Sequence, residues 1–172
     1  FNGNYHTINN LYINTNKHQN EGFFYQITQT TVVQNVKFKN IYINNTNDVA
    51  SIANRAGGIA ALNYGTILNC GIESGSVISY KPSMGYSGNT QSAGGIIGEN
   101  RGTISGCYNK AYVRATGEKS TIYGNAYSGG IAGRSYKNIE NCYNMGNTTA
   151  TSANYSYTGG IAGFVCLWSG QT

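Results

Sequence analysis

Three of the four cysteines stand at matching places in similar stretches, so thiol chemistry is the first possibility to test. Cys70 lies in "GGIAALNYGTILNCGI", Cys107 in "GGIIGENRGTISGCYN" and Cys142 in "GGIAGRSYKNIENCYN", each thirteen residues after the first glycine. Such a set could form disulfides, bind zinc or supply a nucleophile. Structural zinc sites use paired cysteines at short spacing, such as C-x-x-C, and the sequence contains no such pair. The regular spacing instead indicates an internal repeat.

Carboxylates and histidines are too sparse for the usual catalytic arrangements. Glycoside hydrolysis needs two carboxylates across the scissile bond, and calcium-assisted elimination needs an acidic cluster. The six acidic residues stand singly along the chain, and neither histidine lies beside a serine or cysteine with an acid to orient it: Glu21, Asp48, Glu73, Glu99, Glu118, Glu140, His6 and His18. We therefore predict a non-catalytic protein without metal or cofactor, with a carbohydrate-active enzyme on a β-helix as an alternative.

The composition limits the other function classes. Charged residues make up 10% of the chain, against about 25% in an ordinary globular protein, and the 11 basic residues form no run. Binding to nucleic acid needs a concentrated basic face, so we do not expect it, whereas attraction to an anionic polysaccharide is allowed. No apolar segment approaches the roughly 20 residues that span a membrane. Because the chain starts at Phe1 without a methionine or signal peptide, we expect a piece of a larger protein.

Double glycines mark the repeat at intervals of 37, 35 and 30 residues, at Gly57, Gly94, Gly129 and Gly159, with a degenerate copy over residues 21–27. Each opens a strand-like segment, and a turn and a second strand-like segment follow the first three double glycines. Glycine, asparagine and tyrosine at this density oppose helix, and no segment keeps a 3.6-residue apolar period. We predict an all-β fold, a right-handed parallel β-helix (β-solenoid) of roughly five coils. Each coil would hold about three short strands and one variable loop, in a single domain over residues 1–172.

Alignment of the second segments predicts three stacked columns. One is β-branched, one is an apolar core column in which buried free thiols replace Leu and Val, and one is an asparagine ladder that Gly106 interrupts. In-register Cβ vectors run parallel, which suits a disulfide poorly. Cys166 has a different offset and is expected in the core of the last coil. The columns are Ile8, Val33, Ile67, Ile104 and Ile139; Leu11, Val36, Cys70, Cys107 and Cys142; and Asn10, Asn35, Asn69 and Asn141.

The loops before the double glycines vary in length and are expected to emerge on one side of the solenoid. They carry five tyrosines that could bind a protein or glycan ligand, together with Gly, Ser and Asn as adaptable contact residues. Packing against the flank of the coil is the alternative for the same side chains. These candidate binding residues are Tyr86, Tyr123, Tyr127, Tyr155 and Tyr157.

The stretches "GGIAGRSYKNIENCYNMGN" and "GGIIGENRGTISGCYNKAYV" resemble the GLUG motif, a short repeat of secreted and surface-attached bacterial proteins. These include adhesins and the non-catalytic region of IgA-peptidase-like proteins. "FNGNYHTINNLYI" resembles the segment that often precedes such repeats. The resemblance implies an extracellular structural or adhesive module, with neighbouring repeats or copies as further partners, and it supplies no catalytic residue.

The alternative within the same setting is a fibre subunit that stacks head to tail. In that arrangement the last half-coil would contact the first coil of another copy, because unpaired strand edges recruit other strands. The two sets of residues are Ile161, Phe164 and Trp168 at one end, and Phe1, Ile8 and Leu11 at the other.

Overall fold

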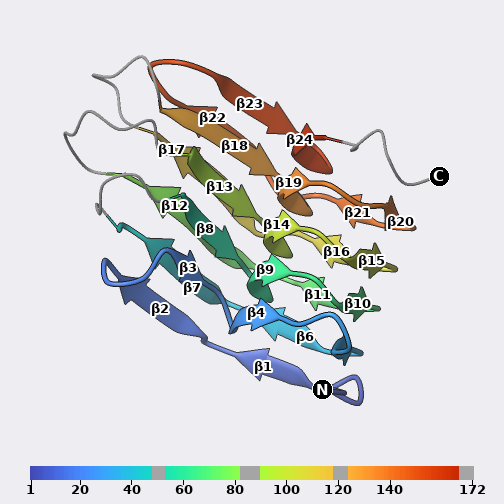
Figure 1. Ribbon diagram of the computed structural model, residues 1–172. Coiled ribbons are helices and arrows are strands. Elements are labelled where there is room, and N and C mark those ends of the chain that lie inside the picture. The colour runs from blue at the N-terminus through green and yellow to red at the C-terminus, as the bar shows by residue number, and fades with distance from the viewer. Residues whose placement is uncertain (48–52, 82–89, 118–123, 167–172) are drawn as a thin grey trace.

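The protein is a parallel β-solenoid in a computed structural model that describes residues 1–47, 53–81, 90–117 and 124–166 (Figure 1). Every pair of hydrogen-bonded strands is parallel, and strands five apart in chain order lie side by side. The N-terminal strands form one end of the stack and the C-terminal strands the other. The predicted all-β solenoid is therefore confirmed, and the described residues contain no helix that is both long and apolar enough to cross a membrane.

Five sheets run along the stack, and four of them take one strand from each of five coils. Sheet A holds β5 (Val32–Gln34), β10 (Thr66–Leu68), β15 (Thr103–Ser105) and β20 (Ile139–Glu140). Sheet B holds β1 (Thr7–Asn9), β6 (Lys37–Lys39), β11 (Gly71–Ile72), β16 (Tyr108–Asn109) and β21 (Tyr143–Asn144).

The other three sheets complete each coil. Sheet C holds β2 (Tyr12–Thr15), β7 (Ile41–Asn45), β12 (Gly75–Tyr80), β17 (Tyr112–Thr116) and β22 (Thr148–Thr151). Sheet D holds β3 (Asn20–Glu21), β8 (Asn54–Gly57), β13 (Thr90–Gly94), β18 (Asn125–Gly129) and β23 (Ser156–Gly159). Sheet E holds β4 (Phe24–Ile27), β9 (Ala60–Asn63), β14 (Ile97–Asn100), β19 (Ala132–Ser135) and β24 (Ala162–Val165).

Each full coil thus contains five short strands, and the prediction of about three was wrong. Two residues link sheet A to sheet B, and the first of them turns the chain with left-handed backbone: Asn35, Asn69 and Asn141 have φ between 51° and 55°, and Gly106 has φ of 65°. Asparagine and glycine adopt this conformation at low cost. So short a corner is easily mistaken for part of a continuous strand in the sequence. The hand of the coil remains a prediction.

The asparagine ladder is therefore a row of left-handed corners. The side-chain amide of Asn69 donates to Asn35 Oδ1 at 3.4 Å, and the side-chain amide of Asn35 donates in turn to Asn2 Oδ1 at 3.2 Å. Gly106 interrupts the amide contacts but keeps the corner, because glycine meets the same backbone requirement. Asn10 was wrongly assigned to this ladder; it accepts a hydrogen bond of 2.8 Å from Asn40 at the corner before sheet C.

The predicted alignment of the first repeat is one strand out of register. Residues Thr7–Asn9 pair with Lys37–Lys39, so Ile8 stacks on Phe38 rather than on Val33. The same shift removes Leu11 from the Val36 column, because the strand that follows it pairs with Ile41–Asn45. The error arose because "TINNLYI" matches both "VVQNVKF" and "KFKNIYI" in its apolar and asparagine positions. In sheet A, Val33, Ile67, Ile104 and Ile139 do stack as predicted.

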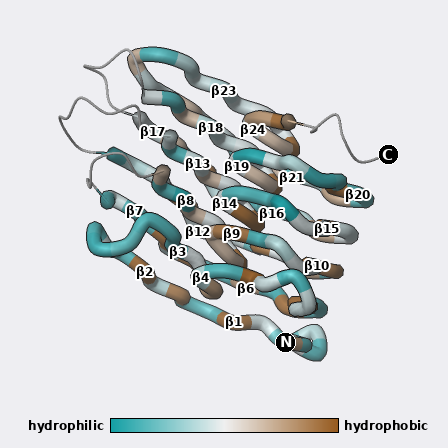
Figure 2. Tube along the Cα trace, in the orientation of Figure 1, coloured by the Kyte–Doolittle hydropathy of each residue, from teal (hydrophilic) through white to brown (hydrophobic). Residues whose placement is uncertain are grey.

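The cysteine column lies in the main core. Val36, Cys70 and Cys107 are buried, Cys142 is half-buried, and all of the cysteines in the described part of the chain are free thiols. The Cys107 amide donates to Cys142 Sγ at 3.3 Å, which places the two residues directly one above the other. Hydrophobic positions are interspersed with hydrophilic ones along each coil, so the core is thin (Figure 2).

The double glycines allow sheets D and E to approach closely. A Cβ at Gly94 would overlap the carbonyl oxygen of Ile97 and lie 2.7 Å from the amide nitrogen of Gly133 in the next coil. On sheet E, a Cβ at Gly98 would lie 2.9 Å from Arg55 Cβ on sheet D. Backbone atoms of neighbouring coils therefore occupy the space that side chains would need. This close contact gives the "GGIxG" pattern its physical reason.

Candidate ligand-binding surface

A column of outward-facing side chains follows sheet E along the stack. Tyr64, Arg101 and Tyr136 each come directly after a strand of this sheet, and Thr28 precedes them in the first coil. Their backbone amides bond from coil to coil: Tyr64 to Ile27, Arg101 to Asn63 and Tyr136 to Asn100. We call Thr28, Tyr64, Arg101 and Tyr136 the outer strip.

Buried polar residues immediately before the strip hold it in place. Asn63, Asn100 and Ser135 are 0%, 0% and 1% exposed, and they bond to one another at 2.8 and 3.1 Å. The oxygens of Asn63 and Asn100 also accept hydrogen bonds from the amides two residues further on. Such local turns fix the backbone while the buried amide faces inward, so the following side chain must face outward.

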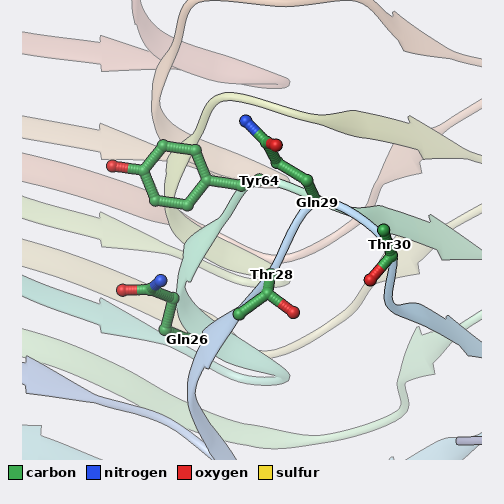
Figure 3. Close-up of a pocket in the computed structure, with 5 residues that line it drawn as sticks. All are labelled: Gln26, Thr28, Gln29, Thr30 and Tyr64. Carbon is green, nitrogen blue, oxygen red and sulfur yellow. The ribbon is translucent and has the colours of Figure 1, made fainter.

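A shallow groove of about 450 Å³ opens at the N-terminal end of the strip. It is lined by Gln26, Thr28, Gln29, Thr30 and Tyr64, and Figure 3 shows the Tyr64 ring beside the two glutamine side chains. Hydroxyl groups and amides both donate and accept hydrogen bonds, and the ring offers an apolar face. This combination suits a sugar, which has hydroxyl groups at its edge and C–H groups on its faces.

Behind the strip, three arginines surround one buried carboxylate. Glu99 is fully buried and accepts hydrogen bonds of 2.6 Å from both Arg55 and Arg101, and another from Arg134. Arg55 also donates to Asn20 Oδ1 at 3.2 Å. Burial raises the pKa of Glu99, but the charges of Arg134 and Arg55 and the hydrogen bonds outweigh it and bring the pKa to about 2. The carboxylate is ionised at neutral pH and tied to structural partners.

Arg101 connects this cluster to the outer strip. Its guanidinium lies 5.9 Å from the centre of the Tyr64 ring and 4.9 Å from that of Tyr136, within the range of cation–π attraction. The side chain remains 45% exposed, whereas those of Arg55 and Arg134 are 16% and 14% exposed. The strip therefore presents one positively charged group between two aromatic rings.

The second carboxylate with strong partners belongs to another part of the coil. Glu73 follows sheet B, where Tyr108 and Lys110 bond to its two oxygens. Hydrogen bonds from Lys110 and then Tyr108 lower its pKa. Glu73 and Glu99 thus have separate partners in separate sheets. Among the described residues, no group of three His, Cys, Asp or Glu side chains could hold a metal ion.

The tyrosines predicted as a loop face do not form one surface. Tyr86 and Tyr123 lie outside the described residues. Tyr127 and Tyr157 lie on strands β18 and β23 rather than in loops, where their rings stack at 5.5 Å. Tyr127 is 8% exposed and packs against Phe164 and Arg134, so the packing alternative describes it better. Tyr155 is exposed and stacks on Tyr157; a binding role for Tyr155 and Tyr157 remains a prediction.

The predicted end-to-end contact is also only partly placed. Trp168 lies outside the described residues, and Phe164 packs within its own chain against Tyr127 and Tyr157 at 5.1 and 5.9 Å. Stacking of separate copies remains a prediction. Cys166, expected in the core, instead continues the outer strip, because its amide bonds to Ser135 and its side chain is half-buried.

The outer strip was missed because its members differ in chemistry. Tyr64, Arg101, Tyr136 and Cys166 each stand seven residues after the first glycine of a double glycine. An alignment that followed this offset would have found the column, although residues so unlike one another give no common pattern. Asn63 and Asn100, one position earlier, are the more regular signal.

These features define a β-solenoid with a polar, aromatic and cationic outer strip. No family model matches the sequence, and a search of curated proteins found no match, so the GLUG resemblance depends on its motifs alone. A crystal structure from Bacteroides ovatus, described as a "putative immunoglobulin A1 protease", is similar to this chain with a TM-score of 0.65 and 25% identity. The similarity covers 96% of this chain and 46% of that one, so the chain spans about half the length of that protein.

Proposed function

We propose that the chain is a non-catalytic, extracellular adhesive module that binds glycans through the groove and the outer strip. The observation that carries the proposal is the groove itself, in which amide and hydroxyl groups stand beside the Tyr64 ring where β4 and β9 end. Hydrogen bonds hold these segments in place: the Thr31 amide donates to Thr28 O at 3.0 Å, and the Tyr64 amide donates to Ile27 O at 2.8 Å. Such pre-organisation lowers the entropic cost of binding.

The non-catalytic part of the proposal is supported by the state of Glu99. Its pKa of about 2 and its three arginine partners unfit it to donate a proton at neutral pH. The extracellular part is supported by the motif resemblance. The Bacteroides ovatus structure supports the solenoid, and the protease activity in its description belongs to that protein.

A glycan array probed with the purified chain tests the proposal. We expect binding to a subset of glycans and a loss of about tenfold or more in the Tyr64→Ala variant, because ring contacts dominate such sites. The control is Tyr12→Ala, which removes a ring that is 68% exposed on sheet C and stacked on Tyr42. Absence of glycan binding, or equal losses in the two variants, would contradict the proposal.

A further inference from the structure

The charges around Glu99 do not balance. Three guanidinium groups, those of Arg55, Arg101 and Arg134, share one carboxylate, which leaves two positive charges (three minus one) in the cluster. No other acidic side chain of the described residues bonds to these arginines. Partial burial strengthens their field because solvent screens them less.

Two buried polar groups in this region also have no hydrogen-bond partner. Arg134 Nε is buried without a partner, and so is the hydroxyl of Ser92, which is 0% exposed. Ser92 pairs in register with Arg55 on one side and Tyr127 on the other, so it belongs to the same region of sheet D. The unpaired N–H of Arg134 shows that Glu99 does not satisfy every donor around it.

Arg101 is the member of the cluster that a ligand can reach. Its Nε donates to Glu99, and its two terminal nitrogens have no hydrogen-bond partner among the described residues. The guanidinium lies over the rings of Tyr64 and Tyr136, which restricts its motion before a ligand arrives. A guanidinium in this state is suited to a planar carboxylate, which it can bind through two parallel hydrogen bonds.

The groove leads directly to this group, because Tyr64 both lines the groove and contacts Arg101. Arg101 lies one coil beyond Tyr64, because Asn100 pairs in register with Asn63, and adjacent coils are separated by about 4.8 Å. A sugar chain lying along the strip would place one unit in the groove and bring the next toward Arg101.

We propose that the outer strip selects acidic glycans, with Arg101 binding the carboxylate of a uronic acid unit next to the unit that occupies the groove. This inference rests on the proposed glycan binding and adds the class of ligand. The groove itself is lined by uncharged side chains, so the preference for acid depends on Arg101 and the cluster behind it.

Isothermal titration calorimetry with oligogalacturonate and its methyl ester tests the proposal, since the two probes share sugar, linkage and length and differ in charge. We expect the acid to bind about tenfold more tightly, equivalent to one charge-assisted contact, and its affinity to fall as salt rises. Arg101→Gln should remove the difference between the two probes. Arg114→Gln, which removes an exposed arginine from sheet C, should leave it unchanged.

The outcomes separate the two proposals. Three results would overturn the acidic selectivity. The first is equal binding of acid and ester by the parent chain, the second is a preference for the acid that survives Arg101→Gln, and the third is a preference that Arg114→Gln reduces as much as Arg101→Gln does. In the first case, binding that Tyr64→Ala still abolishes would leave the glycan site standing. If neither probe binds while neutral glycans on the array do, the selectivity is again wrong and the glycan site is not. Failure of every glycan, acidic and neutral, would remove both proposals.

Discussion

Replacing Gly94 by alanine should strongly destabilise the solenoid. The added Cβ would overlap the Ile97 carbonyl oxygen and lie 2.7 Å from Gly133 N and 2.8 Å from Ile131 O. All three are backbone atoms, so no side chain can move aside, and sheets D and E would have to separate. Overpacking of this kind costs about 3 kcal/mol.

Urea unfolding followed by far-ultraviolet circular dichroism measures the effect. With a slope of about 2 kcal/mol per molar urea, the midpoint should fall by about 1.5 M. Gly160→Ala is the matched control, since a Cβ there has no neighbour within 4 Å and its midpoint should move by less than about 0.3 M. An unchanged Gly94→Ala midpoint, or an equal shift in both variants, would refute the close-packing argument.

Three further predictions concern the charge cluster, the corners and the thiols. Glu99→Gln should lower the free energy of unfolding by about 3 kcal/mol in the same assay. In the parent chain, the stabilisation by ionised Glu99 is complete above about pH 4.5 and is lost as pH falls toward 2, because the pKa of Glu99 is lower in the folded state than in the unfolded state. A parent chain equally stable at pH 6 and pH 3 would contradict this. The free energy of unfolding of Gly106→Asn should lie within about 0.5 kcal/mol of the parent chain's, whereas that of Gly106→Val should be about 1–2 kcal/mol lower because φ is 65° there. Equal losses in the two variants would contradict the left-handed corner. Iodoacetamide should modify Cys142 before Cys70 and Cys107 in the folded chain, because Cys142 is the least buried of the three and its hydrogen bond with Cys107 lowers its pKa. Mass spectrometry measures the order of labelling, and equal labelling of the three would contradict the stacked column.

The sequence allowed the parallel solenoid and the stacking of Val36, Cys70, Cys107 and Cys142 to be predicted, because these features recur at a fixed offset from the double glycines. The strand number per coil was not predictable in the same way. Left-handed asparagine corners interrupt strands without any change in polarity or any proline to mark them. The register of the first coil failed because two neighbouring strands share one pattern.

The candidate site was less predictable than the fold. The groove contains Gln26, Thr28 and Gln29, which belong to the most degenerate repeat and resemble ordinary loop residues in sequence. Glu99 appeared to be an isolated acid, and only the approach of sheets D and E brings Arg55 to it across 44 positions of sequence. The loop tyrosines are abundant in the sequence, whereas the place of Tyr64 depends on where β9 ends.

Ligand is expected to bind along the outer strip of sheet E. Amide chemical-shift mapping by NMR, during titration with the glycan that binds best on the array, tests it most directly. We expect chemical-shift changes at residues 26–30, 62–64, 99–101 and 134–136, and none in sheets B and C. Shifts gathered on sheet B or C, with residues 26–30 and 62–64 unmoved, would contradict it.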